Sequence, residues 1–207
     1  MEAFFAWFKS LFYKPKKLIT IIKDAVITPE TRNMKLLKKA ASQIGVKEIP
    51  GRDSNPLVEA YIAAGFVNNK SSLKDNVPWC AAFVAWCLES VYMGSTNSLM
   101  ARSYEKWGMS SKKHPVPGDI ITFFRNGLSS GQGHVGIYLG VVGSRFYVLG
   151  GNQSDKVCIS VYARSRMTDI RRSSKEFYIS DTQEQSLVKL AQKILKANGF
   201  IKGGSVV

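Results

Sequence analysis

An apolar run that begins at a cysteine does most to limit the folds open to this chain. Pro78 and Trp79 precede Cys80, and the eight residues that follow are all apolar. Proline is favoured in the first turn of a helix, where its missing N–H removes no hydrogen bond. The run therefore predicts a buried helix with Cys80 in its first turn and with Asn76 or Val77 as its cap.

A cysteine in this position is a candidate nucleophile. The first turn of a helix carries partial positive charge and N–H groups without partners. Both stabilise a thiolate, the reactive form of cysteine. The backbone N–H of Cys80 can also donate to an oxyanion, and Asp75 and Asn76 are candidates for the helix cap or a further oxyanion donor. The competing interpretation, a buried core thiol, is the commoner one for a lone cysteine.

A histidine on a later strand supplies the matching base. His134 lies 54 residues after Cys80 and begins a stretch in which apolar residues alternate with others. Such alternation predicts a strand. Its core-facing residues are expected to be Val135, Ile137, Leu139 and Val141, with His134, Gly136 and Tyr138 on the other face. The second histidine, His114, lies among lysines and prolines in an expected exposed loop, so His134 is the candidate base.

A third polar group should orient the His134 ring. Gly143-Ser144 predicts a turn, and residues 145–151 predict a returning strand. This hairpin brings Asn152 and Gln153 near His134. A loop of two or four residues places Gln153 opposite the histidine, and a three-residue loop with a bulge places Asn152 there. The alternatives stay open because a slip of one residue exchanges the two faces of a strand.

Several separated motifs resemble one known group. They are Gly45–Gly51, Asn55-Pro56, Pro78-Trp79-Cys80, Pro117-Gly118-Asp119-Ile120, Gly133-His134-Val135-Gly136 and Gly150-Gly151-Asn152-Gln153. In this order they resemble the bacterial and phage branch of the CHAP and NlpC-type cysteine peptidases, which cut peptidoglycan. The resemblance covers about residues 35–170.

The resemblance implies a fold, a substrate and a third residue. The fold is α+β and papain-like: helices precede a small antiparallel sheet, and the nucleophile lies at a helix N-terminus. The substrate is peptidoglycan, cut at an amide bond by an endopeptidase or an N-acetylmuramoyl-L-alanine amidase. CHAP domains usually carry Glu and then Asn on the strand after the histidine. Asn152 matches that Asn and is the expected third residue, whereas Gly150 stands in the place of the Glu. Trp79 and Trp107 are candidates to flank the cleft.

The composition agrees with a partner that carries negative charge. The formal net charge is +14, which favours polyanions such as nucleic acid, anionic lipid or anionic cell wall. No nucleic-acid-binding motif is present, so we place wall and membrane before nucleic acid.

Cys80 and Cys87 would lie about 10 Å apart on one helix, too far for a disulfide. The third cysteine, Cys158, lies in an expected strand at 157–162. No metal site or cofactor is expected.

The first 31 residues form an expected extension. Met1–Tyr13 is rich in aromatic residues, and lysines follow it. This apolar run is shorter than the roughly 20 residues that span a bilayer, and it lacks the charge order and cleavage site of a secretory signal. Met1–Lys17 is expected either to pack on the domain or to bind an anionic membrane surface or a virion protein. We expect a catalytic domain at 32–172 and a C-terminal amphipathic helix with a loose tail at 173–207.

Two functional alternatives remain beside the hydrolase. One is a structural component of a phage tail or virion with weak or lost activity, and the other is a thiol acyltransferase on a related scaffold. The expected place of action is the bacterial cell wall, including as part of a phage particle. Finally, the arginines at 164, 166, 171 and 172 indicate a solvated surface segment rather than a site.

Overall fold

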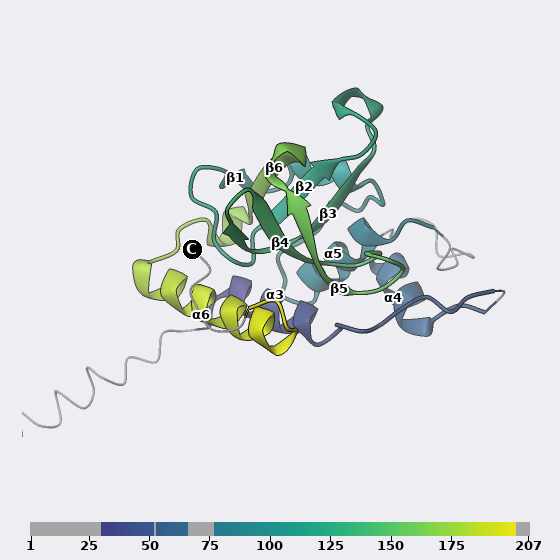
Figure 1. The fold of residues 1–207 in the computed structure, drawn as a ribbon, viewed down its shortest axis with the longest axis horizontal. Helices are drawn as coiled ribbons and strands as arrows, with labels where there is room; N and C mark the ends of the chain where they lie inside the picture. Colours follow the sequence, from purple (N-terminus) through teal and green to yellow (C-terminus); the bar gives the residue numbers. More distant parts are fainter. Residues whose placement is uncertain (1–29, 52, 66–76, 202–207) are drawn as a thin grey trace, which may run out of the picture.

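A six-stranded antiparallel sheet lies over a layer of helices. The computed structural model describes residues 30–51, 53–65 and 77–201. Its α-helices are α3 (Arg32–Ala41), α4 (Pro56–Gly65), α5 (Cys80–Glu89) and α6 (Asp181–Ala197). All four gather on one side of the sheet (Figure 1). The connections contain short 3-10 helices: η1 (Ala101–Lys106), η2 (Leu128–Ser130), η3 (Arg164–Arg166) and η4 (Ser174–Glu176).

The strand order of the sheet is β1-β6-β2-β3-β4-β5. The strands are β1 (Met109–Ser110), β2 (Ile120–Phe124), β3 (Gly133–Val142), β4 (Arg145–Gly150), β5 (Cys158–Ala163) and β6 (Met167–Arg172). Every neighbouring pair is antiparallel. The expected α+β class, with helices before an antiparallel sheet and Cys80 at a helix N-terminus, is confirmed.

The long strand β3 carries the alternation that the sequence predicts. Val135, Ile137 and Leu139 pack in the core that the sheet shares with the helices. Tyr138 faces a second, smaller cluster on the opposite side. The pairing with β4 shifts by one residue between Tyr138 and Gly140. Because this bulge changes the parity of the strand, Val141 packs with the second cluster and not with the first.

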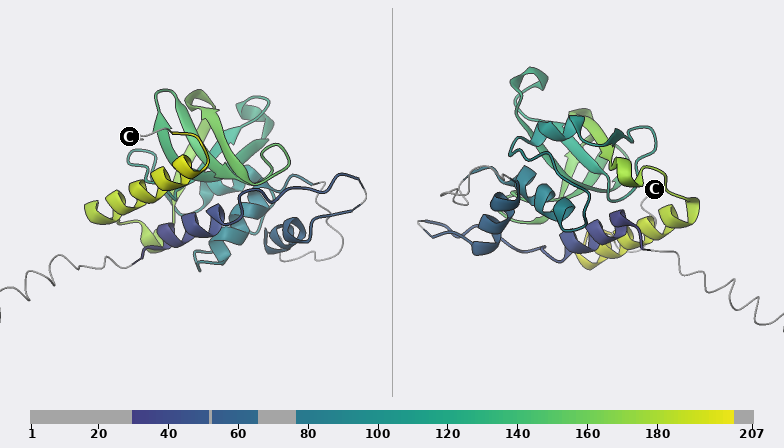
Figure 2. Two further views of the ribbon diagram at one scale, coloured as in Figure 1. Left: turned by 60° about the horizontal axis from the view of Figure 1, so that its bottom comes forward. Right: turned by 180° about the vertical axis from the view of Figure 1, so that it is seen from behind.

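The helix α5 is buried because it has no polar face. Eight of its residues are buried, from Cys80 to Leu88 with the exception of Trp86. It packs between α4 and the sheet, where it meets β3 and β4. The helix α6 lies beside α3 beneath the sheet (Figure 2). Its apolar side chains belong to the same core: Leu187, Ala191, Ile194 and Leu195.

The arginine-rich segment has two parts. Arg164 is exposed in η3, in agreement with the expected solvated surface, whereas Arg171 and Arg172 belong to the strand β6, which corrects that expectation. β6 lies inside the sheet between β1 and β2. Arg172 is 7% exposed, and its guanidinium donates to both carboxylate oxygens of Asp119, at 2.7 and 2.8 Å. Asp119 also accepts from Ser111 Oγ and from the Val116 backbone N–H. A buried arginine with a full set of partners replaces the solvated one that composition suggested.

Several expectations lie outside the described residues. These are the extension Met1–Lys17, the side chains of Asp75 and Asn76, and the tail after residue 201. In the part of the chain that is described, no helix is both long enough and apolar enough for a membrane span.

Candidate active site

Cys80 is the first residue of α5. Trp79 occupies the N-cap position without a side-chain cap bond, which corrects the cap expected at Asp75, Asn76 or Val77. The Trp79 carbonyl accepts from the Phe83 N–H at 2.9 Å and so starts the helical ladder. The Trp79 ring is fully buried, and its Nε1 donates to Glu48 at 2.6 Å. Trp79 therefore anchors the start of the helix and does not line a cleft.

The Cys80 thiol lies against the strand that carries His134. It is 5% exposed, and burial raises its pKa above the ordinary value. Three backbone groups oppose that rise by hydrogen bonding to the sulfur: those of Val135, Ala81 and Cys80 itself. The charge of Arg125 acts in the same direction. Val135 directly follows His134 in β3, so the sulfur lies against the stretch of backbone that carries the histidine.

His134 is fully buried and is bonded through only one ring nitrogen. Its Nε2 lies 3.1 Å from Gln153 Oε1. Its Nδ1 is the one buried side-chain nitrogen or oxygen without a hydrogen-bond partner among residues 30–51, 53–65 and 77–201. Buried polar atoms are nearly always bonded, and an exception calls for an explanation. The lone pair of an unbonded ring nitrogen can accept a proton, which is one such explanation.

Gln153, and not Asn152, contacts the histidine. The expected third residue was Asn152, with Gln153 as the alternative. The loop between β3 and β4 has two residues, but the bulge at Leu139 would bring Asn152 opposite His134 if β4 continued. Instead β4 ends at Gly150, and Asn152 takes a left-handed conformation with φ of 53°. The turn that follows brings the Gln153 side chain back to the imidazole.

The missing Glu at position 150 has a steric explanation. A Cβ on Gly150 would lie 3.2 Å from the Gln153 amide and 3.3 Å from His134 Nε2. Contacts this short force a neighbour to move. The space that a side chain at 150 would need is therefore already taken by Gln153, whose amide meets the same ring nitrogen.

Tyr162 completes the surroundings of His134, and the sequence analysis did not select it. Its ring stacks on the imidazole with centroids 5.1 Å apart and an interplanar angle of 16°. Its hydroxyl donates to Gln153 Oε1 at 3.0 Å. The alternation of β5 was the available signal, because it places Cys158, Ser160 and Tyr162 on one face of the strand.

The electrostatic environment keeps the imidazole neutral. Burial, followed by the charges of Arg125 and Arg166, lowers the pKa of His134 to about 3, while the Gln153 contact opposes the shift. The thiol pKa is raised for the same reason, desolvation. Since both shifts favour uncharged groups, the resting pair at neutral pH is a thiol and a neutral imidazole.

Trp107 borders a groove next to the β2–β3 hairpin. The groove has a volume of about 790 Å³, and its walls also include Arg102, Glu105 and Ser129. Arg102 packs so closely over Gly133 that a Cβ there would lie 2.7 Å from its side chain. Trp107 thus lines a groove in which Arg102, another wall residue, covers Gly133, whereas Trp79 is buried. A role of this groove as the substrate cleft stays a prediction.

The described ranges hold neither a disulfide nor a cluster of potential metal ligands. No group of three or more potential ligands occurs within the described ranges. Cys80, Cys87 and Cys158 are all free. The Cys158 thiol donates to the Gln153 carbonyl at 3.3 Å, so it supports the turn that carries the glutamine.

Comparison with known proteins agrees with these motifs. Residues 72–152 match the family described as the CHAP domain, which confirms the expected resemblance. A similar solved structure is that of a Staphylococcus aureus protein described as similar to a lipoprotein of the NLP/P60 family. It is 18% identical with a TM-score of 0.40, and the match covers 70% of this chain and 44% of that chain. None of the curated proteins matches this chain.

Proposed function

We propose that this chain, whose residues 72–152 match the CHAP domain, hydrolyses an amide bond of peptidoglycan. In this proposal Cys80 is the nucleophile, His134 the general base and Gln153 the residue that orients the base. The observation that carries it is the unbonded Nδ1 of His134. It belongs to a strand whose next backbone group, that of Val135, hydrogen-bonds to the Cys80 sulfur.

The first half of the reaction forms a thioester. His134 Nδ1 takes the proton of the Cys80 thiol as the sulfur attacks the amide carbonyl. The free N–H groups in the first turn of α5 stabilise the resulting oxyanion. The imidazolium then gives its proton to the departing amine, the C–N bond breaks, and the acyl group stays on Cys80.

The second half returns the enzyme to its resting state. His134, again neutral, takes a proton from water as the water oxygen attacks the thioester carbonyl. The C–S bond breaks, the sulfur recovers a proton from the imidazolium, and the carboxylic acid leaves. Burial of the pair supports this route. The buried thiol and imidazole are uncharged at rest, and a thiolate and an imidazolium form only while the substrate is bound.

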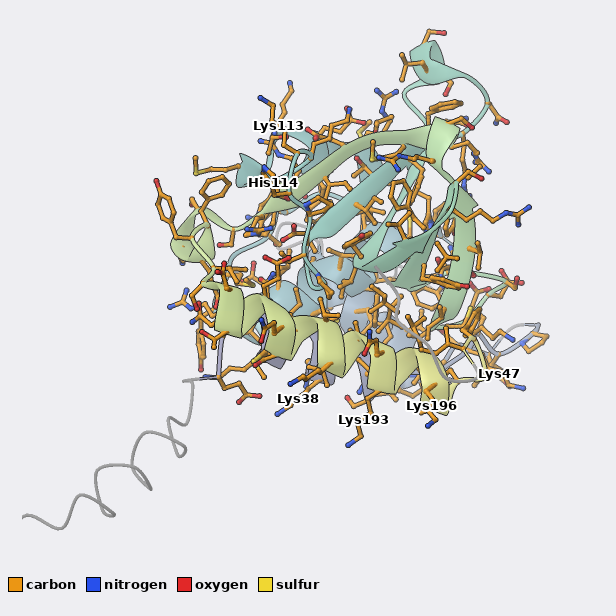
Figure 3. All side chains as sticks on the ribbon, turned by 60° about the vertical axis from the view of Figure 1, so that its left-hand side comes forward. Lys38, Lys47, Lys113, His114, Lys193 and Lys196 are labelled. Carbon is orange, nitrogen blue, oxygen red and sulfur yellow. The ribbon has the colours of Figure 1, made fainter. Side chains whose placement is uncertain are left out.

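The substrate class has support from charge as well as from family. Peptidoglycan lies among anionic wall polymers, and the chain has a net charge of +14. Lys38 of α3 and Lys193 and Lys196 of α6 lie along the outer side of the helical layer (Figure 3). This face would favour approach to an anionic wall, with an effect that salt screens. A role in a phage particle stays a prediction.

Purified peptidoglycan is the test substrate. The wild type is expected to clear a suspension and release new amino groups, Cys80→Ala and His134→Ala are expected to do neither, and Cys87→Ala is the matched control from the same helix. Mass spectrometry of the products then separates the two bonds. A new N-terminus with the lactyl amide still intact marks an endopeptidase, and a freed lactyl carboxyl on the sugar, with a free alanine N-terminus on the stem peptide, marks an amidase. A wild type that releases nothing would favour the structural alternative.

A further inference from the structure

The orientation of the Gln153 amide is fixed from both ends. Its Nε2 donates to the backbone carbonyls of Cys158 and Val148. An NH₂ group can only donate, so its two acceptors determine which way the amide points. The carbonyl end, Oε1, therefore faces His134 and Tyr162.

That orientation determines the tautomer of the histidine. Oε1 is an acceptor, so the atom of His134 that meets it at 3.1 Å has to be a protonated Nε2. In a neutral imidazole the other nitrogen then carries a lone pair and no proton. Nδ1 is thus in the only form that can accept the thiol proton.

Tyr162 acts on the same oxygen. Its hydroxyl donates to Oε1 at 3.0 Å, and burial raises its pKa to about 12, so it remains a donor at neutral pH. A flipped Gln153 would set its NH₂ against Nε2–H, where two donors meet. The Tyr162 hydroxyl could then only accept from the NH₂, and its own proton would lose Oε1, the acceptor that it has in the structure. Tyr162 consequently adds a second penalty to the flip that would put His134 in the other tautomer.

The ring of Tyr162 restrains the imidazole as well. It is stacked between His134 and Phe123, with centroids 5.1 and 4.5 Å away and interplanar angles of 16° and 20°. The three rings come from three different strands of the sheet, β5, β3 and β2. Rotation of the imidazole about its χ2 angle would break this stack.

We propose that Tyr162 is a positioning residue for His134: its hydroxyl holds Gln153 in the orientation that keeps Nε2 protonated and Nδ1 free, and its ring limits rotation of the imidazole. This inference rests on the proposed function for its kinetic consequence. Its structural consequence, the tautomer of His134, does not depend on any substrate.

Tyr162→Phe removes the hydroxyl and keeps the ring. One hydrogen bond to Gln153 is lost, so kcat is expected to fall about 3- to 10-fold with KM unchanged. Tyr138→Phe is the matched control, since Tyr138 lies on the same face of the sheet and its hydroxyl makes no hydrogen bond within the described residues. Its kcat is expected to equal that of the wild type.

A double-mutant cycle separates positioning from general packing. In a Gln153→Leu background the hydroxyl has no amide to hold, so adding Tyr162→Phe is expected to change kcat less than about 2-fold. The same loss in both backgrounds would overturn the proposal, because it would show that the hydroxyl acts independently of Gln153.

Nitrogen-15 NMR of the histidines gives the direct measurement. The wild type is expected to show His134 with Nε2 protonated and Nδ1 not, and Tyr162→Phe to show a measurable share of the other tautomer or of ring exchange. Identical tautomer populations in the two proteins would overturn the proposal. This experiment needs no activity, so an inactive wild type would refute the proposed function while the spectra still decide the role of Tyr162.

Discussion

At the scale of single residues, the position of one amide decides which side chain contacts His134. Asn152 matches the family motif, but its backbone turns away in a left-handed conformation. Gln153, one residue later, reaches Nε2. Strand geometry brought both residues to the histidine, and the family motif favoured Asn152, whereas the structure places Gln153 against the ring. The choice depends on a bulge in β3 and a turn after β4, and neither has a distinctive residue signature.

Replacing each of the two amides tests this assignment. Gln153→Leu is expected to lower kcat by about 10- to 100-fold, because it leaves the buried Nε2–H without an acceptor. Asn152→Gly removes the other side chain and tolerates the positive φ of 53°, so its kcat is expected to stay near that of the wild type. Steady-state rates on soluble muropeptides provide the comparison. The reverse result, with Asn152→Gly impaired and Gln153→Leu active, would return the role to Asn152.

At the scale of elements, the end of β4 controls the spacing of the site. Gly150 borders Gln153 and His134, and Gly151 borders the ring of Trp79.

The sequence predicted the buried helix at Cys80 and the strand at His134 well, because both follow simple hydrophobic patterns. It missed β6, because the pattern of that strand is hidden by arginines whose partners, such as Asp119, come from distant parts of the chain.

The two glycines are expected to respond differently to alanine. Gly150→Ala pushes its Cβ against the Gln153 amide and His134 Nε2, at 3.2 and 3.3 Å. It should lower kcat at least about 10-fold through misplacement of the pair, with a small change in stability. Gly151→Ala meets Trp79 at 2.5 Å and should destabilise the fold by about 1–3 kcal/mol. Urea unfolding and kcat are measured on both variants, to compare the loss of activity in Gly150→Ala with the loss of stability in Gly151→Ala. A fully active Gly150→Ala would contradict this prediction.

At the scale of the whole molecule, burial of the site links stability to pH. The pKa of His134 is lowered to about 3 in the folded chain, against about 6.5 when unfolded. Between these values the unfolded chain binds a proton that the folded chain does not. Stability therefore rises with pH across this window and is lost as pH falls below about 6.5.

Comparison with a variant that lacks the imidazole isolates this effect. From pH 7 to pH 5, the wild type is expected to lose about 2 kcal/mol more unfolding free energy than His134→Phe. Phenylalanine keeps a ring in the stack with Tyr162, and it does not titrate. Urea denaturation at the two pH values measures both losses. Equal losses in the two proteins would mean that His134 titrates in the fold much as it does in the unfolded chain.

The most direct test of the whole account is the chemical state of Cys80 during turnover. Wild-type protein is mixed with a soluble muropeptide, quenched in acid and analysed by peptide mass spectrometry. We predict an acyl adduct on the peptide that contains Cys80, its removal by hydroxylamine, and neither adduct nor new amino groups with Cys80→Ala. Release of new amino groups by Cys80→Ala at the wild-type rate would contradict the account, because the amide bond would then be cut without this thiol.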